Sequence, residues 1–224
     1  MLLLCAHGNE QARAHRVGHG DQPRHLGRSQ NFLGARWVEA PVARAPRAVR
    51  AQVALRFPAL PPHYFYDRDL AAEADRNRRS RQVLCDELIA PLLPPGARVV
   101  DYGCGPGYLA AAVARRAGRV DAVDISRGVL ACARALNGAR NIAYQTPGDY
   151  RPDGAADLAY SFAVAQHLRT EALTGMLRLL AAALRPGGIL LVHFAMAGEL
   201  GYRTEGQSLA DGSLAGRAKL RYGR

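Results

Sequence analysis

The chain has 224 residues and a formal net charge of +11, with 49% hydrophobic and 22% charged residues. This length suits one generous domain with appendages and is too short for two full domains. The balance of apolar and charged residues is typical of a globular protein, which excludes a disordered or fibrous chain. No segment approaches the roughly 20 apolar residues of a membrane span.

The first residues and the cysteines indicate the compartment. The opening MLLLCAHGNE has no basic stretch before its few apolar residues, so it does not read as a secretory signal. Cys5, Cys85, Cys104 and Cys132 lie far apart, without the paired spacing of a zinc site or a redox motif. We therefore expect a reduced, cytoplasmic protein that is not integral to a membrane.

Most of the positive charge lies near the start of the chain. Residues 1–60 hold nine arginines against three acidic residues, among many glycines, alanines and prolines. This composition predicts a basic, poorly ordered arm with only short turns of helix. Such an arm is either a solvated tail or a surface for nucleic acid or an acidic membrane. His15 and His19 have the spacing to share a metal on a helix, but the glycines beside them argue against that helix, so we predict no metal site.

A regular alternation of helices and strands follows the arm. An apolar stripe predicts a helix from Ala71 towards Leu93, ended by PPG at 94–96. The later patterns predict strands at 98–103, 119–126, 141–145, 156–162 and 189–195, and helices at 108–118, 126–138 and 170–184. Ser126 and Thr170 are the predicted N-caps. This order predicts an α/β, Rossmann-like, doubly wound and mainly parallel sheet in three αβα layers, with the domain covering residues 61–198.

A glycine-rich loop follows the first predicted strand of this domain. In VVDYGCGPGYLA, Gly103, Gly105 and Gly107 remove β-carbons, so the backbone can turn tightly and come close to a ligand. The helix that follows would offer free amides to an anionic group. Asp101 stands just before the loop, and Asp124 ends the next predicted strand, where a carboxylate can accept both hydroxyls of a ribose. The alternative is that Asp124 only caps the following helix.

The runs VVDYGCGPGYLA, VDAVDIS, ADLAYSFAVAQHL and LRPGGILLVHF together resemble the motif series of the class I S-adenosylmethionine-dependent methyltransferases, especially the group acting on small molecules. The resemblance covers roughly residues 64–198. It implies S-adenosylmethionine as the cofactor, with the glycine backbone along its methionyl part, Asp101 at its ammonium group and Asp124 at its ribose. The whole cofactor-binding set that it implies is Asp101, Gly103, Cys104, Gly105, Gly107, Asp124, Ile125, Asp149 and Ser161.

Two points of this assignment have alternatives. Asp149 either binds the amino group of adenine, as the resemblance implies, or is an exposed turn residue. A dinucleotide oxidoreductase would also use a glycine loop and an acid at a strand end, but its usual pattern is GxGxxG. The loop here is GxGxG with an acid directly before it, which favours an amino-acid moiety over a pyrophosphate.

The acceptor side is predicted from the loop SFAVAQHL, which faces the site in this fold. His167 is the candidate general base, and Ser161 and Gln166 are candidates to orient a substrate. The alternative for His167 is packing at a helix start, and His193 is interpreted as a buried or strand-end histidine. The aromatic run at 64–66 either covers the cofactor or belongs to the core. Amino-group methyltransferases of nucleic acids and proteins carry an asparagine or aspartate before two prolines in this loop. That motif is absent here, which counts against an exocyclic adenine acceptor.

The end of the chain departs from the family pattern. The family's sheet has seven strands, whereas only 30 residues follow Phe194 and they show no strand alternation. We therefore predict about five strands, without the last two, and a tail at 199–224, with a truncated product as an open alternative. The free sheet edge would be covered by the tail, by a partner in an oligomer, or by nothing.

Three functions fit these patterns. The first is methyl transfer from S-adenosylmethionine to a small-molecule acceptor by direct displacement. The second is a methyltransferase or binding module for RNA or another nucleic acid that uses the basic arm. The third is a catalytically silent domain that only binds the cofactor.

Overall fold

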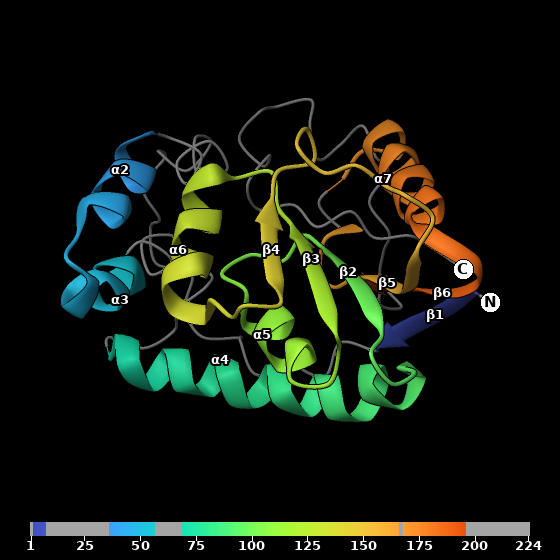
Figure 1. Ribbon diagram of the computed structural model, residues 1–224, viewed down its shortest axis with the longest axis horizontal. Coiled ribbons are helices and arrows are strands. Elements are labelled where there is room, and N and C mark those ends of the chain that lie inside the picture. The colour runs from blue at the N-terminus through green and yellow to red at the C-terminus, as the bar shows by residue number, and fades with distance from the viewer. Residues whose placement is uncertain (1, 8–35, 57–68, 166–167, 196–224) are drawn as a thin grey trace, which may run out of the picture.

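One parallel sheet organises the structure, which is a computed structural model that describes residues 2–7, 36–56, 69–165 and 168–195 (Figure 1). Its strands are β1 (Leu2–His7), β2 (Arg98–Tyr102), β3 (Arg119–Val123), β4 (Ile142–Gln145), β5 (Ala156–Ser161) and β6 (Leu184–Ala195). They lie in the order β1-β6-β5-β2-β3-β4, and every neighbouring pair is parallel.

Helices cover both faces of this sheet. The helices are α2 (Arg36–Arg44), α3 (Arg47–Arg56), α4 (Leu70–Leu84), α5 (Tyr108–Ala114), α6 (Arg127–Asn137) and α7 (Thr170–Ala183). A π-helix (Cys85–Ile89) and a 3-10 helix (Ala90–Leu92) continue α4 without a break. Side chains of α4, α5 and α6 pack on one face of the sheet and those of α7 on the other (Figure 1). The predicted three-layer αβα architecture is thereby confirmed.

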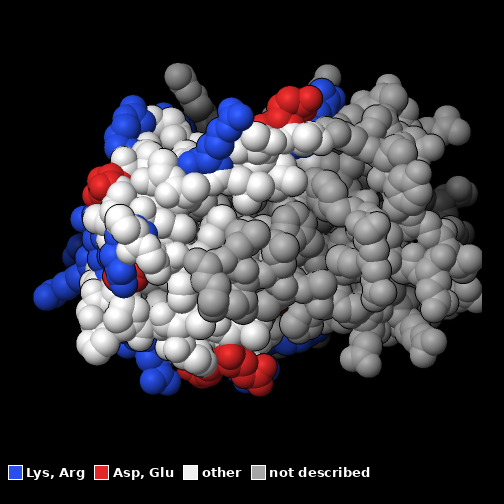
Figure 2. Space-filling view, turned by 90° about the vertical axis from the view of Figure 1, so that its right-hand side faces the viewer, with Lys and Arg blue, Asp and Glu red and all other residues white. Residues whose placement is uncertain are grey.

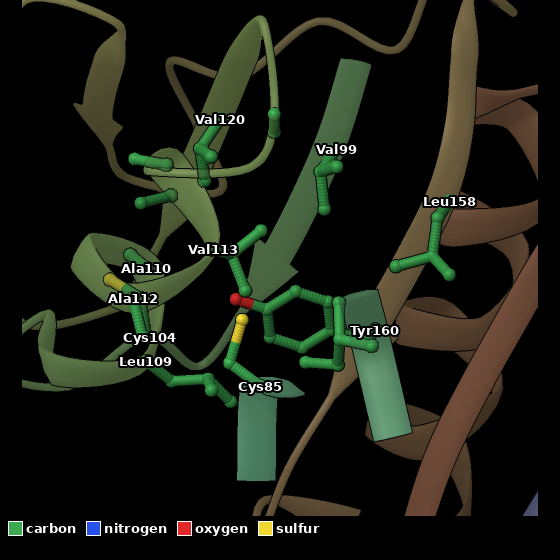
Figure 3. Packing of buried hydrophobic residues seen from close by; sticks show 14 of the residues in the cluster. Cys85, Val99, Cys104, Leu109, Ala110, Ala112, Val113, Val120, Leu158 and Tyr160 are labelled. Carbon is green, nitrogen blue, oxygen red and sulfur yellow. The ribbon is translucent and has the colours of Figure 1, made fainter. Parts of the chain in front are cut away.

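The strand side chains build the core by alternation. On β2, Val99 belongs to the cluster under α4 and α5, whereas the next residue, Val100, belongs to the cluster under α7. Both are fully buried, as expected for a central parallel strand with two covered faces. Figure 3 shows the first cluster, with Tyr160 of β5 among side chains from β2, β3, α5 and the π-helix.

The helix starts largely follow the predicted capping. Ser126 caps α6, because its Oγ accepts a hydrogen bond from the N–H of Val129 at 3.2 Å. Asp69 caps α4 through two N–H groups, those of Ala71 and Ala72. The predicted cap at Thr170 is wrong by one residue, since Arg169 holds the N-cap position of α7 and makes no side-chain cap bond.

The N-terminal segment contains more structure than its composition indicated. We expected only short helical turns in residues 1–60, but α2 and α3 pack on the outer side of α6, where Val42 and Ala54 are buried with Val129 and Cys132. Arg50 donates to the carbonyl oxygens of Ala43 and Ala45, which closes the end of α2. Small alanine and valine side chains at helical spacing supply the packing face, and the surrounding arginines and prolines concealed this pattern. His15 and His19 lie outside the described residues.

The edge of the sheet also differs from the prediction. β1 lies parallel to β6, with Leu2 opposite Leu190 and His7 opposite Ala195. The sheet therefore has six strands in the described residues instead of about five, and the outer side of β6 is paired within the chain. This removes the unpaired β6 edge on which the expectation of an oligomer rested. The predicted tail at 199–224 lies outside the described residues.

Candidate cofactor site

The site lies where the strand order reverses. β2 is flanked by β3 on one side and β5 on the other, and the helices that follow β2 and β5 pack on opposite faces of the sheet. In open α/β sheets, ligands bind in the crevice that this reversal opens at the carboxyl ends of the strands. The loop 103–107 follows β2 directly and lies at this position.

The glycine loop has a backbone that side chains would not allow. Gly103, Gly105 and Gly107 have φ angles of 81°, 52° and 81°, a region that other residues rarely adopt. The N–H groups of Gly103 and Cys104 both donate to the carbonyl of Val123, at 2.7 and 3.1 Å, which fixes the loop over the end of β3. Around Gly105, a β-carbon would meet no atom of the described residues within 4 Å, so bare backbone is open there as far as these segments reach.

Asp124 joins the glycine loop to the start of α6. Its Oδ2 accepts a hydrogen bond from the N–H of Gly105 at 3.0 Å, and its Oδ1 accepts one from the N–H of Ser126 at 2.9 Å. Burial raises the pKa of this carboxyl, although the two N–H groups oppose that rise. Since a carboxylate has about four acceptor positions, two remain for a ligand such as a ribose diol. Asp124 thus faces the loop, and its bond to Ser126 also serves the helix start.

Ile125 is an apolar residue in an unusual position. Its side chain is 86% exposed, next to the half-buried Asp124. Single exposed apolar side chains are common on protein surfaces and do not indicate a site by themselves. Ile125, however, lies beside the Asp124 carboxylate, which bonds to the open backbone of Gly105. The predicted contact of Ile125 with the cofactor stays a proposal that this exposure supports.

Asp101 is buried at the carboxyl end of β2 with an oxygen that lacks a partner. The residue is 2% exposed, and its Oδ2 makes no hydrogen bond to any described residue. Burial raises the pKa of Asp101 to about 7, helped by the charge of Asp124 and opposed by the nearby Tyr160 hydroxyl and Arg81. The Tyr160 hydroxyl lies close enough to influence Asp101, but it forms no hydrogen bond of good geometry with a described residue.

Ser161 and Cys104 have buried side chains. Ser161 is 1% exposed, and its Oγ has no hydrogen-bond partner among the described residues. Its neighbour across the sheet is Val192 of β6, in the cluster under α7. The thiol of Cys104 is buried in the cluster under α5, where burial raises its pKa well above the ordinary value. A buried thiol with a raised pKa is a poor nucleophile, and the contact of Cys104 with the cofactor stays a proposal.

Asp149 follows β4 at the same edge of the sheet, but it is exposed. Its Oδ2 accepts a hydrogen bond from Oγ1 of Thr146 at 2.6 Å, and this bond is the main cause that lowers its pKa. The Asp149 carboxylate is thus bonded to a residue of the same turn. This geometry is compatible with both alternatives, an exposed turn residue and an adenine contact. Its role in adenine binding stays a proposal.

Sequence reasoning missed Arg81 of α4 and Phe162, and it interpreted His193 only as a buried or strand-end histidine. The Arg81 guanidinium lies over the Phe162 ring, 5.6 Å from its centroid, and the His193 ring stacks on Phe162 at 4.3 Å. The signal for Arg81 was its position on the apolar stripe of the helix, four residues before the buried Cys85 and seven before Leu88.

Several predicted site residues lie outside the described residues. These are His167, Gln166 and the aromatic run at 64–66. In the described segments, no three His, Cys, Asp or Glu side chains gather as metal ligands do. None of the helices in those segments combines the length and apolar character that crossing a bilayer requires.

Comparison with known proteins shows which proteins the central part of the chain is similar to. Residues 99–188 match the family model described as methyltransferase domain. The ribosomal protein L11 methyltransferase of Burkholderia mallei is 35% identical over 118 residues, which cover 51% of this chain and 37% of that protein. The malonyl-[acyl-carrier protein] O-methyltransferase of Serratia marcescens is 34% identical over 110 residues, covering 47% and 41%. The chain thus spans less than half the length of either relative.

A solved structure with similar sequence is the S-adenosylmethionine-dependent methyltransferase from Mesorhizobium loti, which is 32% identical. It covers 45% of this chain and 48% of its own, with a TM-score of 0.39. Residues 99–188, which include the glycine loop and the strands β2 to β5, are the part of the chain that is similar to a methyltransferase domain.

Proposed function

We propose that the protein binds S-adenosylmethionine at the carboxyl ends of β2 and β3 and transfers its methyl group to a small-molecule acceptor. The observation that carries this proposal is the coincidence of three features: the open Gly105 backbone, Asp124 bonded to it, and the exposed Ile125 beside it. The orphaned Oδ2 of Asp101 supplies an acceptor that suits the ammonium group of an amino acid. The residues present therefore fit this cofactor.

The chain's own residues need only to bind and orient. When bound, S-adenosylmethionine supplies a methyl group already activated on a sulfonium. Alignment of an acceptor with such a group contributes up to about 7–11 kcal/mol to lowering the barrier, without a covalent intermediate. Asp124 would hold the ribose, Gly103 to Gly107 the methionyl part, and Asp101 its ammonium group. His167 as a general base is part of this proposal for acceptors that hold a proton tightly.

The proposal of a small-molecule acceptor rests on the resemblance of the sequence motifs and not on the size of a cavity. The stacked rings of Phe162 and His193 line a small, mostly apolar cavity of about 10 Å³ together with Leu88, Leu109 and Leu191. A cavity of this size holds about one water molecule, far less than the roughly 300–1,000 Å³ of a small-molecule site. The relatives' names include a ribosomal protein and a carrier protein among their substrates, so a protein-borne acceptor is the competing choice.

Calorimetry with S-adenosylhomocysteine, the demethylated product, tests the cofactor assignment. We expect binding by the full chain, weakened about tenfold or more in Asp124→Ala, because hydrogen bonds to a charged group contribute about 1.5–3 kcal/mol. Asp75→Ala is the matched control, since Asp75 is an exposed carboxylate of α4 that pairs with Arg78. Undiminished binding in Asp124→Ala would remove the ribose assignment. A labelled-methyl screen of a metabolite extract then tests the acceptor class.

A nucleic-acid methyltransferase or binding module is the second candidate. The exposed arginines Arg44, Arg47 and Arg56 of α2 and α3 favour it. On the face seen in Figure 2, by contrast, the basic side chains of the described residues form no continuous band. The candidate requires RNA affinity that falls steeply with salt and is lost when these three arginines become glutamine. Salt-insensitive or undetectable binding would eliminate it.

The third candidate, a catalytically silent domain, differs in one result only. It would bind S-adenosylhomocysteine as above, and no acceptor in the screen would receive a labelled methyl group. If methyl transfer persists in His167→Ala, the enzyme proposal stands and the proposed role of His167 as a general base falls. Alignment of the acceptor would then suffice for the reaction.

A further inference from the structure

A groove of about 450 Å³ lies on the helical side of the molecule and is lined by α4, α5 and the residues around the end of α6. These three helices lie next to one another in the structure (Figure 1). The volume of the groove is within the range of small-molecule sites, roughly 300–1,000 Å³. No residue of the predicted cofactor-binding set is among the described residues that line it. The groove is therefore a candidate site separate from the one at the strand ends.

The charged side chains that line this groove are all positive in the described part of the chain. They are Arg78 of α4 and Arg115 of α5, and no aspartate or glutamate accompanies them in the lining. Arg78 and Gln82 lie one turn apart on the same side of α4. Arg115 donates through Nη1 to Oε1 of Gln82 at 2.7 Å. Gln82 is thus the neighbour of both arginines, and an anion in the groove would meet two cations.

These two arginines keep most of their N–H donors unused among the described residues. Nη1 of Arg78 donates to Oδ1 of Asp75 at 2.6 Å, and Arg115 donates to Gln82. Asp75 is exposed and does not belong to the described lining of the groove. Because a guanidinium carries five N–H donors in a planar fork, each arginine has several left for a ligand.

The groove also offers apolar surface beside these arginines. The guanidinium of Arg78 lies over the ring of Tyr108, 5.9 Å from its centroid, an arrangement that favours one position of this cation. Burial raises the pKa of Tyr108, so its phenol is neutral and adds no negative charge. The small side chains of α5 that line the groove are Ala111, Ala112 and Ala114. They leave room for the organic part of a ligand next to the two charges.

We propose that this groove binds a small organic phosphomonoester, with its phosphate between Arg78 and Arg115 and its organic part on the alanines of α5. Phosphomonoesters carry a charge of about −1.5 to −2 at pH 7 and have three acceptor oxygens, so one phosphate can engage both arginines. The planar guanidinium suits phosphate because it can form two parallel N–H bonds with it. The site is independent of the proposed function, since the two share no described lining residue.

Calorimetry on the full chain with phenyl phosphate tests the proposal, and phenol and inorganic phosphate are the comparison ligands. We expect phenyl phosphate to bind about tenfold or more tightly than either, because only phenyl phosphate has both the anion and the apolar part. Arg78→Gln and Arg115→Gln should each weaken its binding by about tenfold or more, as expected for hydrogen bonds to a charged group. Asp75→Asn should strengthen binding, because it removes the carboxylate that competes for Arg78.

Two further variants control for nonspecific effects. Arg79→Gln removes an exposed arginine of the same helix that is not in the described lining, and it should keep the wild-type affinity. Ala111→Leu fills the groove with a residue that favours helices, so it should abolish binding while α5 stays folded. Absence of phenyl phosphate binding, undiminished binding in both variants of Arg78 and Arg115, or equal affinity for inorganic phosphate overturns the proposal. None of these ligands contains an adenosyl group, so each outcome leaves the cofactor assignment intact.

Discussion

Tyr144 of β4 occupies the space that a side chain on Gly107 would need. Its hydroxyl donates to the carbonyl of Asn137 at 3.0 Å, and the side-chain amide of Asn137 donates to the carbonyl of Pro106 at 2.7 Å. The glycine loop is thus held to β4 and to the end of α6 by a short chain of hydrogen bonds. A loop fixed in this way presents its backbone to a ligand without having to reorganise.

Gly107→Ala should destabilise the protein. The new β-carbon would collide with Tyr144 and would also have to adopt a φ angle near 81°, so we expect a loss of about 1–3 kcal/mol in the free energy of unfolding. Urea denaturation measures it. Gly175→Ala is the control, because Gly175 lies within α7 with no atom near its missing β-carbon. That change should stabilise by about 0.5–1 kcal/mol, and equal effects of the two substitutions would contradict the assignment.

Asp101 should make stability depend on pH between about 4 and 7. Its pKa in the folded protein is about 7, above the ordinary value of 3.8, so in this range the folded state holds a proton that the unfolded state has released. The free energy of unfolding should therefore fall as pH rises through this window, by at most about 1.4 kcal/mol per unit from this group, and level off above it. Asp101→Asn should lose this slope. Parallel curves of unfolding free energy against pH for the two proteins would refute the prediction.

Asp121 should be a major contributor to stability. This fully buried carboxylate of β3 accepts hydrogen bonds from Arg98 at 3.1 and 3.2 Å and from Arg119 at 2.8 Å. Asp121→Ala removes this partner from both guanidinium groups, which are partly exposed, and Arg98 keeps its pair with Asp153, so the change should cost about 1–3 kcal/mol. The exposed pair of Asp75 and Arg78 gives the comparison, and Asp75→Ala should cost at most about 0.5 kcal/mol in the same denaturation measurement.

Ile125→Ala should separate binding from folding. With 86% of its side chain exposed, Ile125 contributes little to the core, so the free energy of unfolding should change by less than about 0.5 kcal/mol. If it covers a face of the bound adenosine, losing that contact should weaken S-adenosylhomocysteine binding by about 3-fold to 30-fold. Thermal melting and calorimetry on the same preparation check both parts. Unchanged affinity would exclude Ile125 from the binding surface.

Features that depend on interactions between residues close in the sequence were predicted correctly. The strands β2 to β6 and the helices α4 to α7 were visible in the sequence, because apolar spacing and turn residues act locally. Asp124 and the glycine loop were found for the same reason, since they lie at the ends of predicted strands. Their positions in the sheet then followed from the rules of parallel αβ connections.

The features that sequence reasoning missed depend on distant partners. β1 is a short apolar run that pairs with β6, and α2 and α3 pack on α6. Arg81 required knowing that α4 brings its guanidinium over the ring of Phe162, which follows β5. Periodicity in one segment carries no information about such pairings.

The pairing of β1 with β6 has a consequence for how the chain folds. β1 is synthesised first and its partner last among the described strands, with Leu2 opposite Leu190. The segment must stay unpaired while the remaining elements emerge from the ribosome, and contacts of such long sequence separation slow the final step of folding. In a nascent chain stalled before β6, the apolar segment of β1 would therefore be exposed without its partner strand. A chaperone would bind the protein in this form.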